Sequence, residues 1–393
     1  MPKLDESIHR PIYMDYQATT PLDKRVLEVM LPFFTESFGN AASIDHEYGA
    51  QAGQAVEHAR KQIAQLINAR HDEIVFTSGS TEADNLAVLG IAEQYENKGK
   101  HIITCVTEHH AVLDPCSYLE SKGWQITRLP VDQYGLVDPD AVRRAITPQT
   151  VLISIMTANN EIGTIAPVEE IGKIAREHEI LFHTDATQAV GHIPMDVEAM
   201  NIDLLSMSAH KFYGPKGIGA LYVRKLRPRV KLATQMHGGG HERGMRSGTL
   251  NVPGIVGMGK AAELARQEMP IESKYVLELR DLLWRGIQEN IEGVQINGHP
   301  TLRLPHNLSV YIPGVESRSL VVKLKHDVAL STGSACTTAK VEPSHVILAL
   351  GFGEERAYGS VRFGVGRGNN LNDVAFVTKH LAQAVETIKL LLS

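Results

Sequence analysis

Residues 203–214 read Asp-Leu-Leu-Ser-Met-Ser-Ala-His-Lys-Phe-Tyr-Gly, and this stretch decides the fold. Its apolar start is typical of a strand that is buried on both faces. Lys211 follows that strand between small and polar neighbours, where an amine can act as a nucleophile that forms Schiff bases. Most lysines instead lie in solvated surface turns. The rest of the chain has to decide between these two interpretations.

Composition narrows the class of protein. The 393 residues suggest two or three domains, and the hydrophobic content of 43% and charged content of 21% are normal for a soluble enzyme. The net charge of -6, without a long basic block, predicts that neither nucleic acid nor an anionic membrane is the main partner. No apolar stretch is long enough to span a membrane, and residues 1–7 lack the apolar run of a signal peptide.

The three cysteines are Cys105, Cys116 and Cys336. They are too few for a disulfide framework, which favours a reducing, cytoplasmic location. Cys105 has the setting of a buried core residue, and Cys116 that of a residue on the face of a short helix.

Short apolar runs alternate with amphipathic stretches between about residues 70 and 225. This alternation predicts an α/β fold with a mainly parallel sheet and helices on both faces. A helix is expected over 168–178, and a longer one precedes the sheet over 51–66. The runs that are expected to form strands are 73–76, 101–106, 151–156, 180–183 and 203–206.

The pattern changes near 268–273, and we expect a helix over 275–291, a strand over 307–311 and a closing helix. The apolar face of the closing helix is formed by Val374, Val377, Leu381, Val385 and Ile388. We therefore predict a large domain over 16–265 and a smaller α+β domain formed by 1–15 and 266–393.

Polar residues follow the predicted strands. The first group, residues 77–82, reads Thr-Ser-Gly-Ser-Thr-Glu and precedes a helical run. Hydroxyls and a glycine at a helix N-terminus can hold a phosphate, because free N–H groups and the helix dipole both face the anion. The alternative is that Ser80 or Thr81 only caps the helix.

Four further strand ends also carry polar side chains, and capping alone explains them poorly. Ligands of open parallel sheets bind beyond the carboxyl ends of the strands, so these residues are expected to share one pocket. A lysine for a Schiff base, a carboxylate for a pyridinium nitrogen and a phosphate cradle together fit pyridoxal 5′-phosphate. The residues at these strand ends are His109, Asn160, Asp185, Gln188, Ser208, His210 and Lys211.

Competing motifs fail on spacing. The chain has no G-x-x-x-x-G-K-[ST], no G-x-G-x-x-G and no G-x-S-x-G. His237 and His241 are separated by three glycines, which will not form a helix that aims both imidazoles at one metal. We interpret this stretch as a flexible loop at the rim of a site, either of the same chain or of a neighbouring subunit, and expect no metal.

Two residues of the second half leave alternatives open. Cys336 lies among small polar residues, which favours an exposed thiol nucleophile on a mobile loop, although a semi-buried cysteine near a helix start is equally compatible. Arg362 has small and apolar neighbours and needs an anion. That anion is either a substrate carboxylate or the partner in a structural salt bridge.

Together these residues resemble the cysteine desulfurases of the NifS/IscS type, which are class V aminotransferases and fold-type I pyridoxal phosphate enzymes. The resemblance runs from Tyr13 to Arg367. Its most specific pieces are Thr-Glu-His at 107–109, Asn-Asn-Glu-Ile-Gly at 159–163, Asp-Ala-Thr-Gln at 185–188, Ser-Ala-His-Lys at 208–211, the stretch 237–249 and Ser-Ala-Cys-Thr at 334–337.

The resemblance implies conversion of L-cysteine to L-alanine with the sulfur left as a persulfide on Cys336. Lys211 would form the Schiff base and move the Cα proton, Arg362 would bind the substrate carboxylate, and Asn160 would lie near cofactor and substrate. The resemblance also implies a homodimer that supplies sulfur to acceptor proteins or iron–sulfur scaffold proteins. The other implied cofactor contacts are Asp185 to the pyridinium nitrogen, Gln188 to the phenolic oxygen, His109 stacked on the ring and moving protons, and Ser80, Thr81, Ser208, His210 and the partner subunit's Thr249 to the phosphate.

Two other functions stay open on the residues alone. An aminotransferase or β-lyase acting on another amino acid would not need Cys336, and formation of alanine distinguishes it. A binding or scaffold protein that keeps the fold without the cofactor is disfavoured by Lys211, Asp185 and His109.

Overall fold

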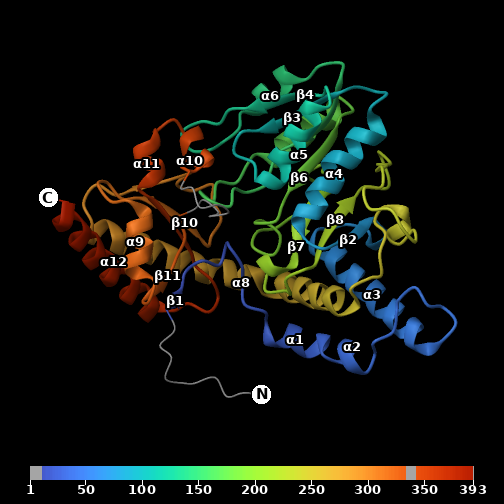
Figure 1. Ribbon diagram of the computed structural model, residues 1–393, viewed down its shortest axis with the longest axis horizontal. Helices are drawn as coiled ribbons and strands as arrows, with labels where there is room; N and C mark the ends of the chain where they lie inside the picture. The colour runs from blue at the N-terminus through green and yellow to red at the C-terminus, as the bar shows by residue number, and fades with distance from the viewer. Residues whose placement is uncertain (1–10, 333–341, 393) are drawn as a thin grey trace.

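A seven-stranded sheet forms the centre of the larger part of the molecule (Figure 1), in a computed structural model that describes residues 11–332 and 342–392. The strand order is β2-β8-β7-β6-β5-β3-β4. Only β8 runs antiparallel to its neighbours, so the sheet is mainly parallel as predicted. The strands are β2 (Ile74–Thr77), β3 (His101–Cys105), β4 (Gln125–Leu129), β5 (Thr150–Ser154), β6 (Leu181–Asp185), β7 (Leu204–Ser208) and β8 (Gly219–Val223).

Every predicted strand of this sheet is confirmed, with bounds shifted by one or two residues at some ends. Two further strands, β4 and β8, were not predicted from the sequence. The edge strand β4 is half exposed and lacks a continuous apolar run. β8 is fully buried but starts at Gly219, close to the glycine-rich turn after Lys211, so its first half resembles a loop.

Helices cover both faces of the sheet, as expected of this fold class. On one face, α4 (Ser80–Tyr95) and α5 (His110–Ser121) pack into one hydrophobic cluster. The other face carries a larger cluster formed with α3 (Glu47–Leu66), α7 (Val168–Glu177) and the first half of α8 (Val252–Asn290). Shorter helices are α1 (Lys24–Met30), α2 (Pro32–Thr35) and α6 (Pro139–Ala145).

The predicted start of a new helix at residue 275 is wrong. α8 is one continuous helix of 39 residues that includes Pro270. Its first half packs against the cluster under the large sheet, whereas Val276, Leu279, Leu283 and Ile287 pack into a separate cluster. The change in apolar pattern near 268–273 therefore marks a change of packing partner and not a helix end. The division of domains at residue 266 stays a prediction.

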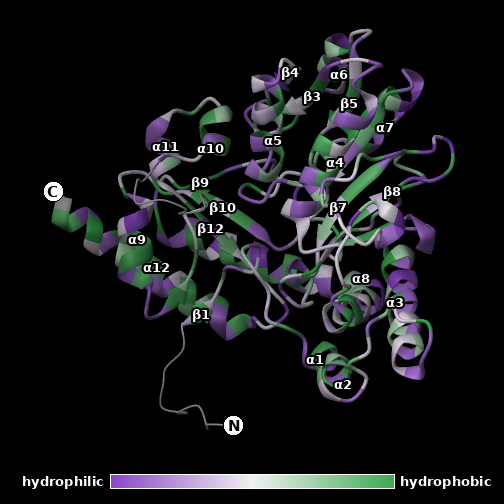
Figure 2. Ribbon diagram, turned by 45° about the vertical axis from the view of Figure 1, so that its right-hand side comes forward, coloured by the Kyte–Doolittle hydropathy of each residue, from purple (hydrophilic) through white to green (hydrophobic). Residues whose placement is uncertain are grey.

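The second cluster belongs to a smaller layer of strands and helices (Figure 1). Its antiparallel sheet has the order β12-β10-β9, and β1 pairs in parallel with β11. The closing helix α12 (Leu371–Leu392) alternates hydrophobic and hydrophilic residues along its length (Figure 2), and the predicted apolar face is buried or half-buried there. The other elements are β1 (Ile12–Tyr13), β9 (Gln295–Ile296), β10 (Asn307–Tyr311), α9 (Ser317–Leu324), β11 (Val328–Ala329), α10 (His345–Ala349), α11 (Glu354–Tyr358) and β12 (Ser360–Gly364).

None of the helices within 11–332 and 342–392 is both long and apolar enough to cross a lipid bilayer.

Candidate functional site

A cavity of about 660 Å³ lies where the large sheet meets the smaller layer. Its walls come from the ends of several parallel strands, from the N-terminal segment around Gln17 and from β12. The structure therefore brings together most of the residues that the sequence placed in one pocket. The predicted residues that line it are Ser80, Thr81, His109, Asn160, Asp185, Gln188, His210, Lys211 and Arg362.

Two of the described residues that were predicted for the site do not line this cavity. Ser208 lines an adjacent hollow that shares Ser80, Thr81 and His210 with the main cavity. Thr249 is exposed and lines neither hollow. Cys336 lies outside the described residues.

The adjacent hollow has the features of an anion cradle. α4 begins at Ser80, and its N-cap residue Gly79 makes no side-chain cap hydrogen bond. The alternative that Ser80 or Thr81 serves as the cap is therefore wrong. A Cβ on Gly219 of β8 would lie 2.7 Å from the Cα of Gly79, so the glycine allows the strand to approach the turn closely. The first N–H groups of α4 thus face a hollow that Lys216 also lines.

Lys211 lies in a short 3-10 turn, residues 209–211, directly after β7. Its Nζ donates hydrogen bonds to the carbonyl oxygens of Gln17, at 2.5 Å, and Ala18, at 2.9 Å. Burial, together with the positive charge of Arg362, lowers the pKa of the Lys211 amine to about 8. A surface lysine in a turn is therefore the wrong interpretation. The unprotonated amine, which a nucleophile or a base requires, therefore becomes the main form above about pH 8 and not only above about pH 10.

Asp185 ends β6 and projects its carboxylate into the cavity. Its Oδ1 accepts a hydrogen bond of 2.9 Å from the Thr187 backbone N–H, which fixes the side chain. The Gln188 side chain donates to the Gln17 carbonyl oxygen at 3.1 Å. An anion held at this point suits a cationic ring nitrogen.

His109 is both a helix cap and a pocket residue. Its Nδ1 accepts a hydrogen bond of 3.1 Å from the Ala111 N–H at the start of α5, which places the ring proton on Nε2. Burial lowers the pKa of His109, and the charge of Asp185 opposes that shift only in part. The imidazole is therefore neutral near pH 7, with one N–H to donate.

Arg362, on β12, makes the structural salt bridge that was one of the two interpretations, and its binding of a substrate carboxylate stays a prediction. Its guanidinium pairs with the Asp15 carboxylate at 2.8 Å and donates to the Asn160 carbonyl oxygen at 2.7 Å. Its Nε is buried without a hydrogen-bond partner among the described residues, although the side chain lines the cavity. The arginine therefore has a structural ion pair and also spare donor capacity toward a ligand.

Other buried polar atoms at the wall of the cavity also lack partners within the described ranges. They are both amide atoms of Gln17 and the hydroxyl oxygen of Thr187. Unsatisfied buried polar groups are rare and costly, so they indicate that a polar ligand completes the site. A ligand with a ring nitrogen, a phenolic oxygen and a phosphate fits this set of donors and acceptors.

A buried acid–histidine group behind the pocket was missed by the sequence analysis. Asp84 on α4 lies 3.5 Å from His183 Nε2, and His183 also contacts Ser206 at 3.0 Å and Ser154 at 2.8 Å. Burial, with the charge of Asp185 next, raises the pKa of Asp84 well above its usual value. The sequence signal that could have indicated this group is an acidic residue on an otherwise apolar helix face, together with polar residues in three buried strands.

The two described cysteines are structural. Cys105 is buried, as predicted, and Cys116 lies on the helix α5, as predicted, with its side chain buried as well. Burial raises the pKa of Cys105 to about 11 and that of Cys116 to about 12, so both thiols stay protonated and unreactive near neutral pH.

The chain matches the family model for class-V aminotransferases over residues 12–377. It is 54% identical to the cysteine desulfurase IscS of Anaeromyxobacter dehalogenans over 379 residues, which cover 96% of this chain and 93% of that protein. It is 51% identical to the cysteine desulfurase IscS of Rickettsia rickettsii, with 97% and 92% covered.

Solved structures agree with this likeness. A NifS-like protein superimposes with a TM-score of 0.89 at 37% identity, covering 96% of this chain and all of that one. SspA in complex with cysteine superimposes with a TM-score of 0.79 at 38% identity, covering 90% of this chain and 99% of that one.

Proposed function

This chain belongs to the class-V aminotransferase family and is a cysteine desulfurase, and on that premise we propose how its residues divide the reaction. We propose that the cavity holds pyridoxal 5′-phosphate, that L-cysteine binds between Lys211 and Arg362, and that Cys336 receives the sulfur. The observation that carries the proposal is an amine of lowered pKa and a buried carboxylate in one cavity beside an uncapped helix N-terminus.

Several residues would hold the cofactor. Lys211 would bind its aldehyde carbon covalently, Asp185 its ring nitrogen and Gln188 its phenolic oxygen, while the neutral His109 imidazole would stack on the ring. When bound, the cofactor supplies an electron sink for charge released at the substrate Cα. The phosphate would be held by Ser80, Thr81, Ser208, His210 and, in a homodimer, Thr249 of the partner subunit.

Arg362 would bind the substrate carboxylate. Its unpartnered Nε is the donor that such a carboxylate can take without breaking the ion pair to Asp15. The Asn160 side chain also lines the cavity, and its backbone oxygen already orients the guanidinium. A guanidinium that is fixed by its own ion pair would hold the carboxylate in the cavity that Lys211 also lines.

Lys211 would move the proton at Cα. An amine with a pKa of about 8 is largely available as a base at mildly alkaline pH, and the carbonyl oxygens of Gln17 and Ala18 can hold the proton after transfer. The neutral His109, with its proton on Nε2, can donate or accept a second proton at the same face of the cavity.

Cys336 would take the sulfur by nucleophilic attack. Its thiolate forms an S–S bond with the substrate sulfur while the substrate C–S bond breaks and leaves its electron pair on carbon. Protonation of that carbon gives alanine, and Cys336 keeps the sulfur as a persulfide. The resemblance to IscS-type enzymes supports this role.

The test is incubation with L-cysteine followed by mass analysis of the peptide that contains Cys336. We expect one added sulfur and an equal amount of alanine. Cys336→Ser should lose the persulfide and keep the visible absorbance of the bound cofactor. Release of sulfur from cysteine by Cys336→Ser without added thiol would show that another nucleophile acts.

The partners follow from the same chemistry. A persulfide must be passed to a thiol-containing acceptor, so we propose that sulfur-acceptor proteins, among them iron–sulfur scaffold proteins, dock on a homodimer of this chain. A cytoplasmic location fits the free thiols of Cys105 and Cys116. Size-exclusion chromatography with light scattering tests the dimer.

A further inference from the structure

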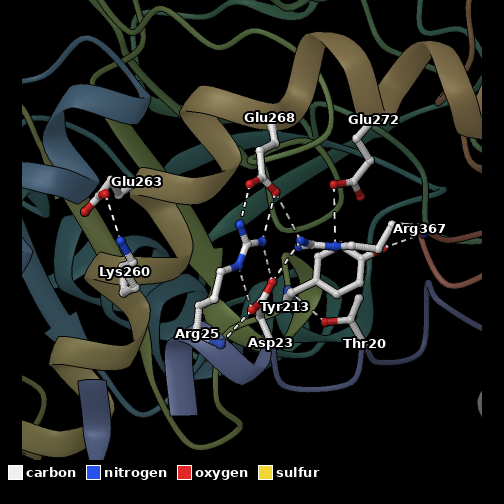
Figure 3. Close-up of polar contacts among 9 residues, drawn as sticks. All are labelled: Thr20, Asp23, Arg25, Tyr213, Lys260, Glu263, Glu268, Glu272 and Arg367. Carbon is white, nitrogen blue, oxygen red and sulfur yellow. Dashed lines mark hydrogen bonds and ion pairs between the residues drawn. The ribbon is translucent and has the colours of Figure 1, made fainter. Parts of the chain in front are cut away.

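A cluster of charged side chains surrounds Tyr213, two residues after Lys211 (Figure 3). The cluster joins three distant parts of the chain: the start of α1, the middle of α8 and the segment that follows β12. We call it the Arg367 cluster, and its charged members are Asp23, Arg25, Glu268, Glu272 and Arg367.

Arg367 is the member that stacks on the Tyr213 ring. Its guanidinium carbon lies 3.4 Å from the centre of the Tyr213 ring, and its backbone N–H donates a hydrogen bond of 3.0 Å to the Tyr213 hydroxyl. Asp23 at 3.0 Å, Glu268 at 3.4 Å and Glu272 at 3.5 Å hold the guanidinium over the ring. A planar guanidinium can stack on a ring and keep its ion pairs, whereas an ammonium cannot do both.

Tyr213 has an unusual backbone. Its φ of +64° is in the left-handed region, which non-glycine residues rarely adopt. The Thr20 hydroxyl accepts a 2.8 Å hydrogen bond from the Tyr213 N–H, and the Asp23 N–H donates to the Tyr213 carbonyl oxygen at 3.1 Å. Tyr213 therefore depends on contacts from outside its own turn.

Hydrogen bonds from two other segments also hold the turn that carries Lys211. The Thr20 hydroxyl also donates to the His210 carbonyl oxygen at 2.9 Å. In addition, His192 Nε2 donates a hydrogen bond of 2.9 Å to the carbonyl oxygen of Lys211 itself. The position of the lysine amine thus follows from how this turn is held.

We propose that Arg367 is a positioning residue for Lys211, which acts by holding Tyr213. The inference rests on the proposed role of Lys211 in moving the Cα proton. Arg362 lies five residues earlier, on β12 of the same segment. Residues 362–367 therefore set both the group that would bind the substrate carboxylate and the turn that carries the lysine.

The test compares Arg367→Ala with Arg25→Ala in the cofactor-loaded, full-length protein. Arg25 is a matched control, because it pairs with Asp23 and Glu268 of the same cluster and, within the described ranges, does not stack on Tyr213. Two quantities are measured: hydrogen exchange of the peptide that contains residues 212–214, whose amides are hydrogen-bonded, and the kinetics of alanine formation.

We expect Arg367→Ala to raise exchange in this peptide by about tenfold or more. We also expect kcat to fall by about a hundredfold with little change in KM, because a small misplacement of a catalytic group is costly. Arg25→Ala should change each quantity by less than about twofold. Arg367→Lys keeps the charge but not the stacked plane and should show the same two changes in weaker form, which covers the case in which the alanine variant does not fold.

Unchanged exchange or unchanged kcat in Arg367→Ala would overturn the proposal, and so would equal effects in Arg25→Ala. The variant Lys211→Ala tests the proposed function separately from the positioning role of Arg367. If Lys211→Ala kept full turnover, the proposed role of Lys211 would be wrong. If Arg367→Ala left hydrogen exchange unchanged, only the positioning role of Arg367 would be refuted.

Discussion

Glu242→Gln is expected to destabilise the protein far more than Glu57→Gln, although both glutamates pair with Arg60. The Arg60 and Glu242 side chains are 3% and 2% exposed and make two contacts of 2.8 Å. Glu242 also accepts a hydrogen bond of 2.8 Å from the Phe76 N–H of β2, the strand that leads into the phosphate cradle. Glu57 contacts the same arginine at 2.9 Å but is 50% exposed.

The magnitudes follow from burial. Removing one charge of a buried pair costs about 3–5 kcal/mol, because the partner charge stays in the interior without compensation. An exposed pair contributes about 0–1 kcal/mol, since water solvates both charges after the change. A cost of about 3 kcal/mol lowers the ratio of folded to unfolded protein by more than about a hundredfold.

The assay is urea unfolding followed by circular dichroism at one fixed protein concentration, because dimerisation would shift the midpoint with concentration. The two variants and the unchanged protein are compared by their free energies of unfolding. A loss below about 1 kcal/mol in Glu242→Gln, or equal losses in both variants, would refute the argument from burial.

The remaining predictions concern the reactive groups. In the cofactor-free protein, labelling of Lys211 by an amine reagent should rise with pH with a midpoint near the pKa of about 8, and Arg362→Gln should move that midpoint upward because a neighbouring positive charge is removed. A midpoint near 10 in the unchanged protein would contradict this, as would a downward shift in the variant. Arg362→Lys should raise KM for L-cysteine about ten- to a hundredfold with kcat less affected, because a hydrogen bond between charged groups contributes about 1.5–3 kcal/mol; an unchanged KM would place the carboxylate elsewhere. Iodoacetamide at pH 8 should leave Cys105 and Cys116 unmodified in the native protein, which peptide mass analysis can check, and rapid modification of either would show that its thiol is not buried.

Much of the candidate site could be predicted from the sequence because of how parallel sheets are built. The carboxyl ends of the neighbouring parallel strands β3, β5, β6 and β7 meet at one edge, so the polar residues after each apolar run had to lie close together. That rule led to Lys211, Asp185 and His109 without knowledge of any contact between them. The family motifs then assigned their roles.

Other features depend on partners that are distant in the sequence. The continuity of α8 through Pro270 is set by two separate clusters, each of which packs against one half of the helix. The antiparallel β8 is recognisable only from its pairing with β2 and β7. Neither feature leaves a periodic signal in its own residues.

The sequence by itself determined the α/β class, the strand-end residues and the chemistry they can perform, because the alternation of apolar runs with amphipathic stretches is a local property of the chain. Only the tertiary structure decided that the Lys211 amine has a lowered pKa, that Arg362 already has an anionic partner, and that Arg367 stacks on Tyr213. Desolvation and pairing of charges depend on what surrounds a group in space. Those surroundings come from segments up to several hundred residues apart, as with Asp15 and Arg362.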